Sequence, residues 1–138
     1  MKKLFVVTGA GGHLGGTIIR QLEGGQNEVR GLLFRDEKKT DGENTHYYRG
    51  DVRDAESLRP LFEGCGDKET IVIHTAGLID ISNHVSPELY DVNVNGTKNI
   101  LTLCREYQVK RLVYVSSVHA IPERKEKGVT GETQRFSP

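Results

Sequence analysis

The sequence predicts an α/β protein built around a doubly wound parallel sheet of about five strands. Short apolar runs that end at glycine or at polar residues alternate along the chain with helix-like segments. The 138 residues are 36% hydrophobic, which suffices for the core of one ordinary domain. Strands and helices that alternate at this spacing form right-handed crossovers, which place a parallel sheet between two layers of helices.

The first half of the chain contains three of the expected strands. Residues 4–7 form a continuous apolar run before glycine, which is typical of a strand buried on both faces. A helix is expected over residues 13–22, because the two glycines that follow can take the left-handed geometry of a helix end. The next strands are expected at residues 28–34 and 45–48, on either side of a polar loop.

Two helices and two strands are expected in the second half. Asp54 can cap a short helix that runs to Phe62, since its carboxylate would accept a hydrogen bond from a free amide of the first turn. Residues 70–74 and 112–115 are the fourth and fifth strands. Between them, Ser86 and the proline after it begin a helix of roughly twenty residues. The sheet-facing stripe of this helix recurs at steps of three and four: Leu89, Val92, Gly96, Ile100 and Leu103.

Residues 1–121 are therefore predicted to form one domain, and residues 122–138 a polar loop or tail.

Nineteen Lys and Arg balance nineteen Asp and Glu, so the charge points to neither nucleic acid nor an anionic membrane. The N-terminus does not have the pattern of a signal peptide, and we expect a cytoplasmic protein. Cys65 and Cys104 lack ligand spacing and the histidines are not paired for a metal, so no metal site is expected.

A glycine-rich segment lies between the first strand and the first helix. It reads Thr8-Gly9-Ala10-Gly11-Gly12-His13-Leu14-Gly15, with glycines at 9, 12 and 15 in a G-x-x-G-x-x-G pattern. These glycines would allow a tight turn, a backbone with no side chain against a pyrophosphate, and close packing of helix on sheet. The phosphates would lie at the helix N-terminus, where free N–H groups and the helix dipole favour anions. A flexible turn is the alternative, and Gly11 and Gly16 have no assigned task.

The spacing and the preceding threonine resemble the extended branch of the short-chain dehydrogenase/reductase superfamily, which includes epimerases, dehydratases and dihydroflavonol-type reductases. Residues 50–54, 74–77, 93–97 and 116–117 match further segments of this family in the right order. The resemblance implies a Rossmann-like fold that binds NAD(P), with Ser117 polarising a substrate and Asn93 positioning a proton-relay water. The cofactor-binding residues it implies are Thr8, Gly9, Gly12, His13, Leu14, Gly15, Arg35, Asp51, Val52, Thr75, Ala76, Gly77, Asn93 and Ser116.

Each match has a structural alternative. Asp51 could cap a helix instead of contacting adenine. His74 could be a structural side chain at a strand end. Ser116 and Ser117 could be turn residues, although ligands lie at the carboxyl ends of the strands in a doubly wound sheet. Asn93 lies on the sheet-facing stripe, where an amide without a partner is costly, so it needs either a hydrogen-bond partner or the relay water.

The end of the second strand decides between NADP and NAD. An acidic residue there would bind the ribose 2′-hydroxyl of NAD, whereas an arginine accommodates the 2′-phosphate of NADP. Arg35 occupies the position at which reductase-like members carry their phosphate-binding arginine, and a guanidinium can bind a phosphate bidentately. Asp36 is adjacent, so a slip of one residue would favour NAD, and Arg35 could also be a solvated loop residue. We expect NADP, with NAD as the alternative.

The family's chemistry requires a Tyr-x-x-x-Lys pair, and none of the five tyrosines has a lysine four residues on. In the family this pair follows the serine of the fifth strand by roughly thirty residues, as the resemblance implies. We therefore expect the dinucleotide-binding part of an oxidoreductase, epimerase or dehydratase that acts on a carbonyl or hydroxyl substrate. The part would be truncated before the catalytic helix and the substrate domain, and would have little turnover of its own. A non-catalytic NAD(P) sensor and a structural or partner-binding module are the alternatives, and an unpaired fifth strand would favour a homo-oligomer.

Overall fold

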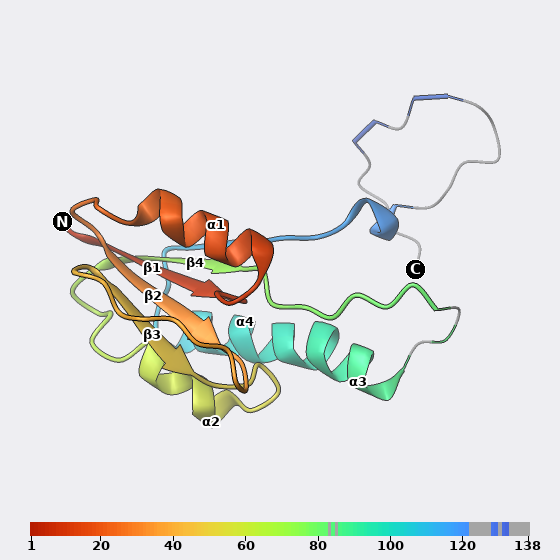
Figure 1. Ribbon diagram of the computed structural model, residues 1–138, viewed down its shortest axis with the longest axis horizontal. Helices are drawn as coiled ribbons and strands as arrows, with labels where there is room; N and C mark the ends of the chain where they lie inside the picture. Colours follow the sequence, from red (N-terminus) through yellow and green to blue (C-terminus); the bar gives the residue numbers. More distant parts are fainter. Residues whose placement is uncertain (83, 85, 122–127, 130, 133–138) are drawn as a thin grey trace.

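The computed structural model describes residues 1–82, 84, 86–121, 128, 129, 131 and 132. Five parallel strands form one sheet: β1 (Lys3–Thr8), β2 (Glu28–Leu33), β3 (Thr45–Arg49), β4 (Glu69–His74) and β5 (Arg111–Tyr114). Their order across the sheet is β3-β2-β1-β4-β5. β1 is central, and the chain builds outward from it first to one side and then to the other (Figure 1). This confirms the predicted doubly wound, Rossmann-like fold.

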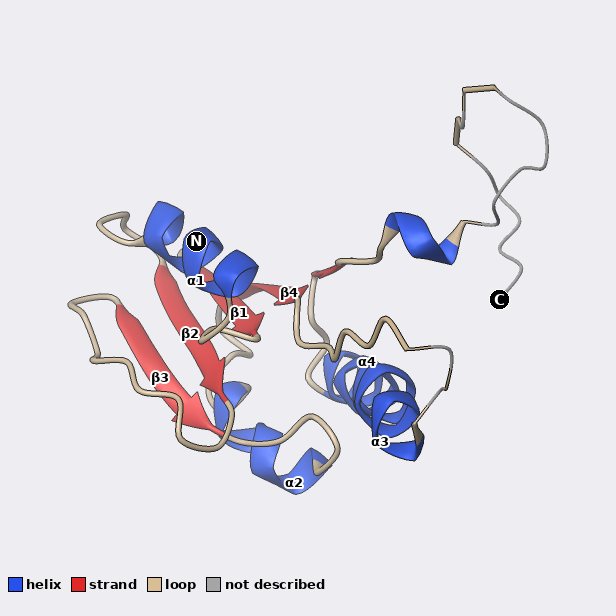
Figure 2. Ribbon diagram, turned by 45° about the vertical axis from the view of Figure 1, so that its right-hand side comes forward, coloured by secondary structure: helices blue, strands red, loops and turns tan. Residues whose placement is uncertain are grey.

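Helices lie on both faces of the sheet (Figure 2). Helix α1 (His13–Leu22) covers one face, and α2 (Ala55–Leu58) with the 3₁₀ turn η1 (Arg59–Leu61) lies on the other. The long helix predicted after Ser86 also covers that second face. It consists of α3 (Pro87–Tyr90), a π-helical turn η2 (Asp91–Asn95) and α4 (Gly96–Glu106), which follow one another without a gap. The π-helical turn was not predicted.

The core has two parts, because successive side chains of a strand point to opposite faces of the sheet. Under α1, Ile19 packs with Val7 and other apolar residues of β1 and β2. On the opposite face, Val6 belongs to a larger cluster that α2, η1 and α4 cover with Phe62 and Leu103. Val6 and Val7 are both fully buried, so β1 is the strand enclosed on both sides that its apolar run predicts.

Several element boundaries differ from the predicted ones by one residue. β2 ends at Leu33, not at Phe34, because the chain turns there: Arg35 has a φ of +49° and the Glu37 amide donates to the Phe34 carbonyl at 3.1 Å. β5 begins and ends one residue earlier than expected. β1 and β3 extend beyond their predicted bounds, since backbone pairing continues into flanking polar residues.

Asp54 is the predicted helix cap, and its carboxylate accepts a hydrogen bond from the Glu56 amide at 3.1 Å. The segment after it is not one helix to Phe62. It changes to 3₁₀ geometry at Arg59, because Pro60 has no amide hydrogen with which to continue the α-helical hydrogen bonds.

The last element of the described part is the 3₁₀ turn η3 (Val118–Ala120). Most of the predicted tail, residues 122–127, 130 and 133–138, lies outside the described residues. None of the helices in the described ranges has the length and apolar character needed to cross a membrane.

Candidate functional site

The glycine-rich loop after β1 meets the loop after β4 at the carboxyl edge of the sheet. Thr8 lies beside His74 in the parallel pairing of β1 and β4, so the residues that follow each strand are neighbours. The Thr8 hydroxyl accepts hydrogen bonds from the Thr75 and Ala76 amides, both at 3.1 Å. The Thr75 hydroxyl in turn donates to the Thr8 carbonyl at 2.7 Å. These loops therefore meet between β1 and β4, where the order of the strands reverses direction. The crevice at this point is where doubly wound sheets bind ligands.

Two glycines of this loop are required by its geometry. Gly9 has a φ of +67°, a region that side chains disfavour, and a Cβ at Gly9 would lie 2.7 Å from the Thr75 hydroxyl oxygen. A Cβ on Gly15 would lie only 2.1 Å from the Gly9 carbonyl oxygen. The loop is therefore a compact turn onto which α1 packs directly.

The N-terminus of α1 lies at this loop and carries no cap. Gly12 precedes the helix without a side-chain hydrogen bond, and the first turn contains no acidic residue. The first N–H groups of a helix have no partner inside it, and the helix dipole adds positive potential at the same end. His13 and Leu14 are in the first turn and are exposed. The loop and the helix end thus fit a phosphate group, with backbone donors and no Cβ in the way.

Glu37 also belongs to the site, although the sequence pattern did not single it out. A Cβ on Gly11 would lie 2.4 Å from a Glu37 carboxylate oxygen, so Glu37 occupies the space beside the glycine loop. The same oxygen accepts a hydrogen bond from the Phe34 amide at 2.8 Å. A side chain on Gly11 would therefore displace the end of the Glu37 side chain. An acidic residue near the end of β2 is the available signal in the sequence, but Asp36 and Glu37 both satisfy it.

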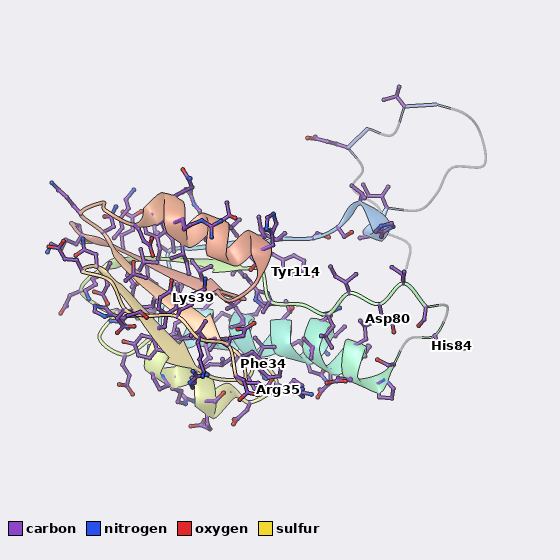
Figure 3. The ribbon with its side chains drawn as sticks, viewed as in Figure 1. Phe34, Arg35, Lys39, Asp80, His84 and Tyr114 are labelled. Carbon is purple, nitrogen blue, oxygen red and sulfur yellow. The ribbon has the colours of Figure 1, made fainter. Side chains whose placement is uncertain are left out.

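Arginines surround Phe34 at the end of β2. The guanidinium carbons of Arg35 and Arg53 lie 4.7 Å and 5.8 Å from the centre of the Phe34 ring. Both guanidinium groups also approach one carboxylate oxygen of Glu88 in α3, at 3.8 Å and 3.5 Å. Arg49 donates a hydrogen bond to the Arg35 carbonyl. Phe34 and Arg35 are labelled in Figure 3, where they lie together at this end of the sheet. Three guanidinium groups therefore lie beyond the glycine loop, with the Glu88 carboxylate close to two of them.

Asp51 pairs with Arg53 and does not cap α2. Its carboxylate accepts hydrogen bonds from the Arg53 backbone at 2.9 Å and from its guanidinium at 2.7 Å. The side-chain hydrogen bond from Arg53 is the main cause that lowers the pKa of Asp51. Val52 is buried, and it packs so closely on Gly96 that a Cβ there would lie 2.6 Å from it. The structure thus places Val52 in the core between the end of β3 and α4.

The Asn93 side chain holds the loop that follows β4. Its amide oxygen accepts a hydrogen bond from the Leu78 amide at 2.8 Å, and its amide nitrogen donates to the Leu78 carbonyl at 2.9 Å. A Cβ on Gly77 would lie 3.2 Å from the same amide oxygen. The Leu78 backbone is therefore the partner that this amide requires. Asn93 lies in the π-helical turn, an irregularity that is frequent at functional sites.

Ser116 and Ser117 follow β5 and are exposed. The Ser117 hydroxyl accepts a hydrogen bond from the His119 amide at 3.2 Å and caps η3. This contact corresponds to the structural alternative for Ser117, a turn residue at the end of a strand.

His74 is buried between β1 and α4. Its Nδ1 lies 2.7 Å from the Thr8 hydroxyl and its Nε2 lies 3.0 Å from the Thr97 hydroxyl. Burial lowers the pKa of His74 to about 4, so the imidazole is neutral at pH 7. The ring also stacks on Tyr114 of β5, with the ring centres 5.8 Å apart. His74 therefore joins three elements that surround the site.

The two cysteines do not belong to the candidate site. Cys65 and Cys104 are buried and not bonded to each other, and burial raises the pKa of Cys104 to about 11. In the part of the chain that the structure covers, no group of three His, Cys, Asp or Glu residues could hold a metal ion.

The strand order, the glycine loop on the N-terminus of α1 and the loops gathered around them define a Rossmann-like protein of the extended short-chain dehydrogenase/reductase class. Residues 6–137 match the 3-beta hydroxysteroid dehydrogenase/isomerase family, and the chain belongs to this family.

Individual relatives agree with this assignment. Cinnamoyl-CoA reductase 1 of Oryza sativa subsp. japonica is 36% identical over 147 residues, covering 96% of this chain and 40% of the relative. The 3 beta-hydroxysteroid dehydrogenase type 7 of Rattus norvegicus is 34% identical over 127 residues, covering 86% of this chain and 36% of the relative. A mutant uronate dehydrogenase of Agrobacterium tumefaciens, solved in complex with NAD, superimposes with a TM-score of 0.72 at 25% identity, covering 88% of this chain and 43% of that one. The chain thus spans about two-fifths of the length of these proteins.

Proposed function

We propose that this chain binds a nicotinamide dinucleotide at the carboxyl edge of its sheet, and that it forms the cofactor-binding part of an oxidoreductase, epimerase or dehydratase. The cofactor would accept or donate a hydride, and the substrate would carry a carbonyl or hydroxyl group. Asn93 and Ser117 are the residues we assign to the substrate side. Their roles follow from the family resemblance, since the contacts described above are structural ones.

One observation carries the proposal. The Gly9 turn, the close packing of Gly15 on it and the uncapped N-terminus of α1 form a single backbone surface at the crevice beside β1 and β4. A surface with free amide donors and no side chains is what a pyrophosphate requires. The mutant uronate dehydrogenase with the same fold is complexed with NAD, which supports this assignment of the ligand.

We further propose that the dinucleotide is NADP. Arg35, Arg49 and Arg53 gather at the ends of β2 and β3, where Arg35 and Arg53 both approach the Glu88 carboxylate and Arg53 also pairs with Asp51. A 2′-phosphate would find the guanidinium groups of Arg35 and Arg49 there, because Arg35 approaches Glu88 only at 3.8 Å and Arg49 bonds to a backbone carbonyl, whereas Arg53 is already paired with Asp51. Glu37 supports the alternative, because a carboxylate beside the glycine loop favours a ribose diol and opposes a second phosphate.

Calorimetric titration of the 138-residue chain with NADPH and NADH tests both proposals. Binding of either dinucleotide, lost in a Gly15→Ala variant, is expected from the pyrophosphate surface. Tighter binding of NADPH is expected from the arginines. Absence of binding to both ligands would overturn the proposed function, whereas tighter binding of NADH would overturn only the preference.

A further inference from the structure

His74 lies in a chain of hydrogen bonds that runs from the glycine loop to the π-helical turn. The Thr75 and Ala76 amides bond to the Thr8 hydroxyl, which lies 2.7 Å from Nδ1 of His74. On the other side of the ring, Nε2 lies 3.0 Å from the Thr97 hydroxyl. The Thr97 hydroxyl donates to the Asn93 carbonyl at 2.7 Å. Each of these hydrogen bonds joins two residues that the candidate site contains.

The direction of these hydrogen bonds follows from counting donors and acceptors. A hydroxyl has one hydrogen and two lone pairs. The lone pairs of the Thr8 oxygen are used by the two amides, so its hydrogen must be donated, and Nδ1 of His74 is the atom in reach. Nδ1 is therefore unprotonated. In the neutral ring the hydrogen is then on Nε2, which donates it to Thr97.

The Thr97 hydroxyl agrees with this assignment independently. Its own hydrogen is donated to the Asn93 carbonyl, so its oxygen is free to accept from Nε2 of His74. All the bonds of the chain then point the same way, from the Ala76 amide to the Asn93 carbonyl, and such chains strengthen cooperatively. No buried side-chain nitrogen or oxygen in the described residues is left without a partner.

We propose that His74 is a positioning residue that couples the glycine loop to the turn holding Asn93, and that it does so as the Nε2–H tautomer. This inference rests on the proposed function, because the loop it positions is the assigned dinucleotide site. At one end, Thr8, which directly precedes Gly9 of the glycine loop, binds the Thr75 and Ala76 amides in the loop after β4. At the other end, Asn93 holds Leu78 in the loop after β4.

Removal of the Thr97 hydroxyl should therefore change the contacts of Thr8. Without that hydroxyl, the Nε2–H group is a buried donor with no acceptor, which is costly. The imidazole can relieve this by moving its hydrogen to Nδ1. Nδ1–H would then face the Thr8 oxygen, whose lone pairs already accept from two amides, so the hydrogen bonds that hold the loop weaken.

The test compares Thr97→Val with Thr102→Val in the full 138-residue chain. Thr102 is a matched control, because its hydroxyl makes the same bond to the carbonyl four residues back, with Lys98 at 2.9 Å, on an exposed part of the same helix. Three quantities are measured: the nitrogen resonances of His74 in ¹⁵N-labelled protein, amide hydrogen exchange at Thr75 and Ala76, and the affinity for NADPH. Thr97→Ser, which keeps the hydroxyl, serves as the rescue variant.

In the wild type and in Thr102→Val, Nδ1 of His74 should resonate as an unprotonated nitrogen and Nε2 as a protonated one. In Thr97→Val, Nδ1 should become protonated at least in part, exchange at Ala76 should accelerate about tenfold, and NADPH should bind about five- to tenfold more weakly. Thr97→Ser should return all three quantities toward the wild-type values.

The proposal is overturned if Nδ1 is protonated in the wild type, or if Thr97→Val matches Thr102→Val in tautomer, exchange and affinity. Failure of the proposed function is a separate result. The wild-type chain would then bind neither NADPH nor NADH, while the tautomer and exchange measurements, which need no ligand, still decide whether His74 positions the loop.

Discussion

The carbonyl oxygen of Gly9 lies where a side chain on Gly15 would begin, since a Cβ added to Gly15 would be 2.1 Å from it. Gly15 belongs to the first turn of α1 and Gly9 opens the loop after β1. The helix therefore approaches the loop closely enough for its free amides to face the same point as the loop backbone. This contact sets the shape of the assigned phosphate site.

Substitution of Gly15 by Ala should disrupt that shape. Because the added methyl group meets backbone atoms, α1 must move away from the loop, which should cost about 1–3 kcal/mol of unfolding free energy and abolish dinucleotide binding. Denaturant unfolding and calorimetric titration measure these effects. Gly66→Ala is the control, since a Cβ at Gly66 meets nothing within 4 Å. Equal binding by the two variants would show that the loop is not the phosphate site.

Arg35→Ser should lower the affinity for NADPH about tenfold and leave the affinity for NADH nearly unchanged, because only NADPH carries the 2′-phosphate. Arg105→Ser removes the same charge at the C-terminal end of α4 and controls for the general electrostatic effect. Parallel losses for both ligands in Arg35→Ser would instead indicate that the side chain supports the loop after β2.

Glu37→Gln also distinguishes a preference for NADP from one for NAD, because it removes a negative charge where Arg35→Ser removes a positive one. The amide oxygen can still accept from the Phe34 amide, so the loop should be retained while the negative charge beside Gly11 is removed. We expect NADPH to bind several-fold more tightly, because repulsion between the carboxylate and the phosphates is gone. A large loss of NADH affinity in titrations of this variant would mean that the carboxylate binds the ribose diol and that the chain prefers NAD.

The strands and the long helix could be predicted because their signals are local. Apolar runs mark β1 and β4, and the three- and four-residue steps of Gly96, Ile100 and Leu103 mark the buried stripe of the helix. The end of β2 could not be placed correctly, because Phe34 continues the apolar run. The turn after it depends on the Glu37 carboxylate, which bonds to the Phe34 amide in the folded chain.

The contacts of the site join residues far apart in the chain, and this limits what spacing reveals. Glu37 meets Gly11, and His74 meets both Thr8 and Thr97. The family segments identify which stretches are involved, but not which atoms bond. The π-helical turn was not predicted, since the step of four residues from Val92 to Gly96 fits an α-helical turn as well as a wider π-helical one.

Asn93→Asp should release the loop after β4. The carboxylate can still accept from the Leu78 amide but cannot donate to its carbonyl, so one of the two hydrogen bonds is replaced by repulsion between oxygens. We expect faster amide exchange at Leu78 and a loss of about 1–2 kcal/mol of unfolding free energy. Asn99→Asp, which removes a donor to the Val52 carbonyl, should leave exchange at Leu78 unchanged. Equal exchange at Leu78 in both variants would contradict the assigned role.

Burial of His74 should make the stability of the fold depend on pH. Its pKa is about 4 in the folded chain, whereas an unperturbed histidine, as in the unfolded chain, has a pKa of 6.5. Between these values the unfolded chain binds a proton that the folded chain does not, so the unfolding free energy falls as the pH is lowered. The contribution of the neutral His74 side chain to the unfolding free energy is fully present above about pH 6.5. About 3 kcal/mol of the unfolding free energy is lost by about pH 4.

Replacement of His74 should remove that part of the pH dependence. Denaturant unfolding of the wild type and of His74→Gln at a series of pH values should give a difference in unfolding free energy that shrinks steadily from about pH 6.5 to about pH 4. His46→Gln is the control, because the His46 side chain is 44% exposed and pairs with the exposed Asp41 at 3.3 Å. Asp51 and Glu28 have lowered pKa values, so their protonation changes the unfolding free energy mainly below this pH range. A difference between wild type and His74→Gln that stays constant across the range would show that His74 is protonated as readily in the folded chain as in the unfolded one.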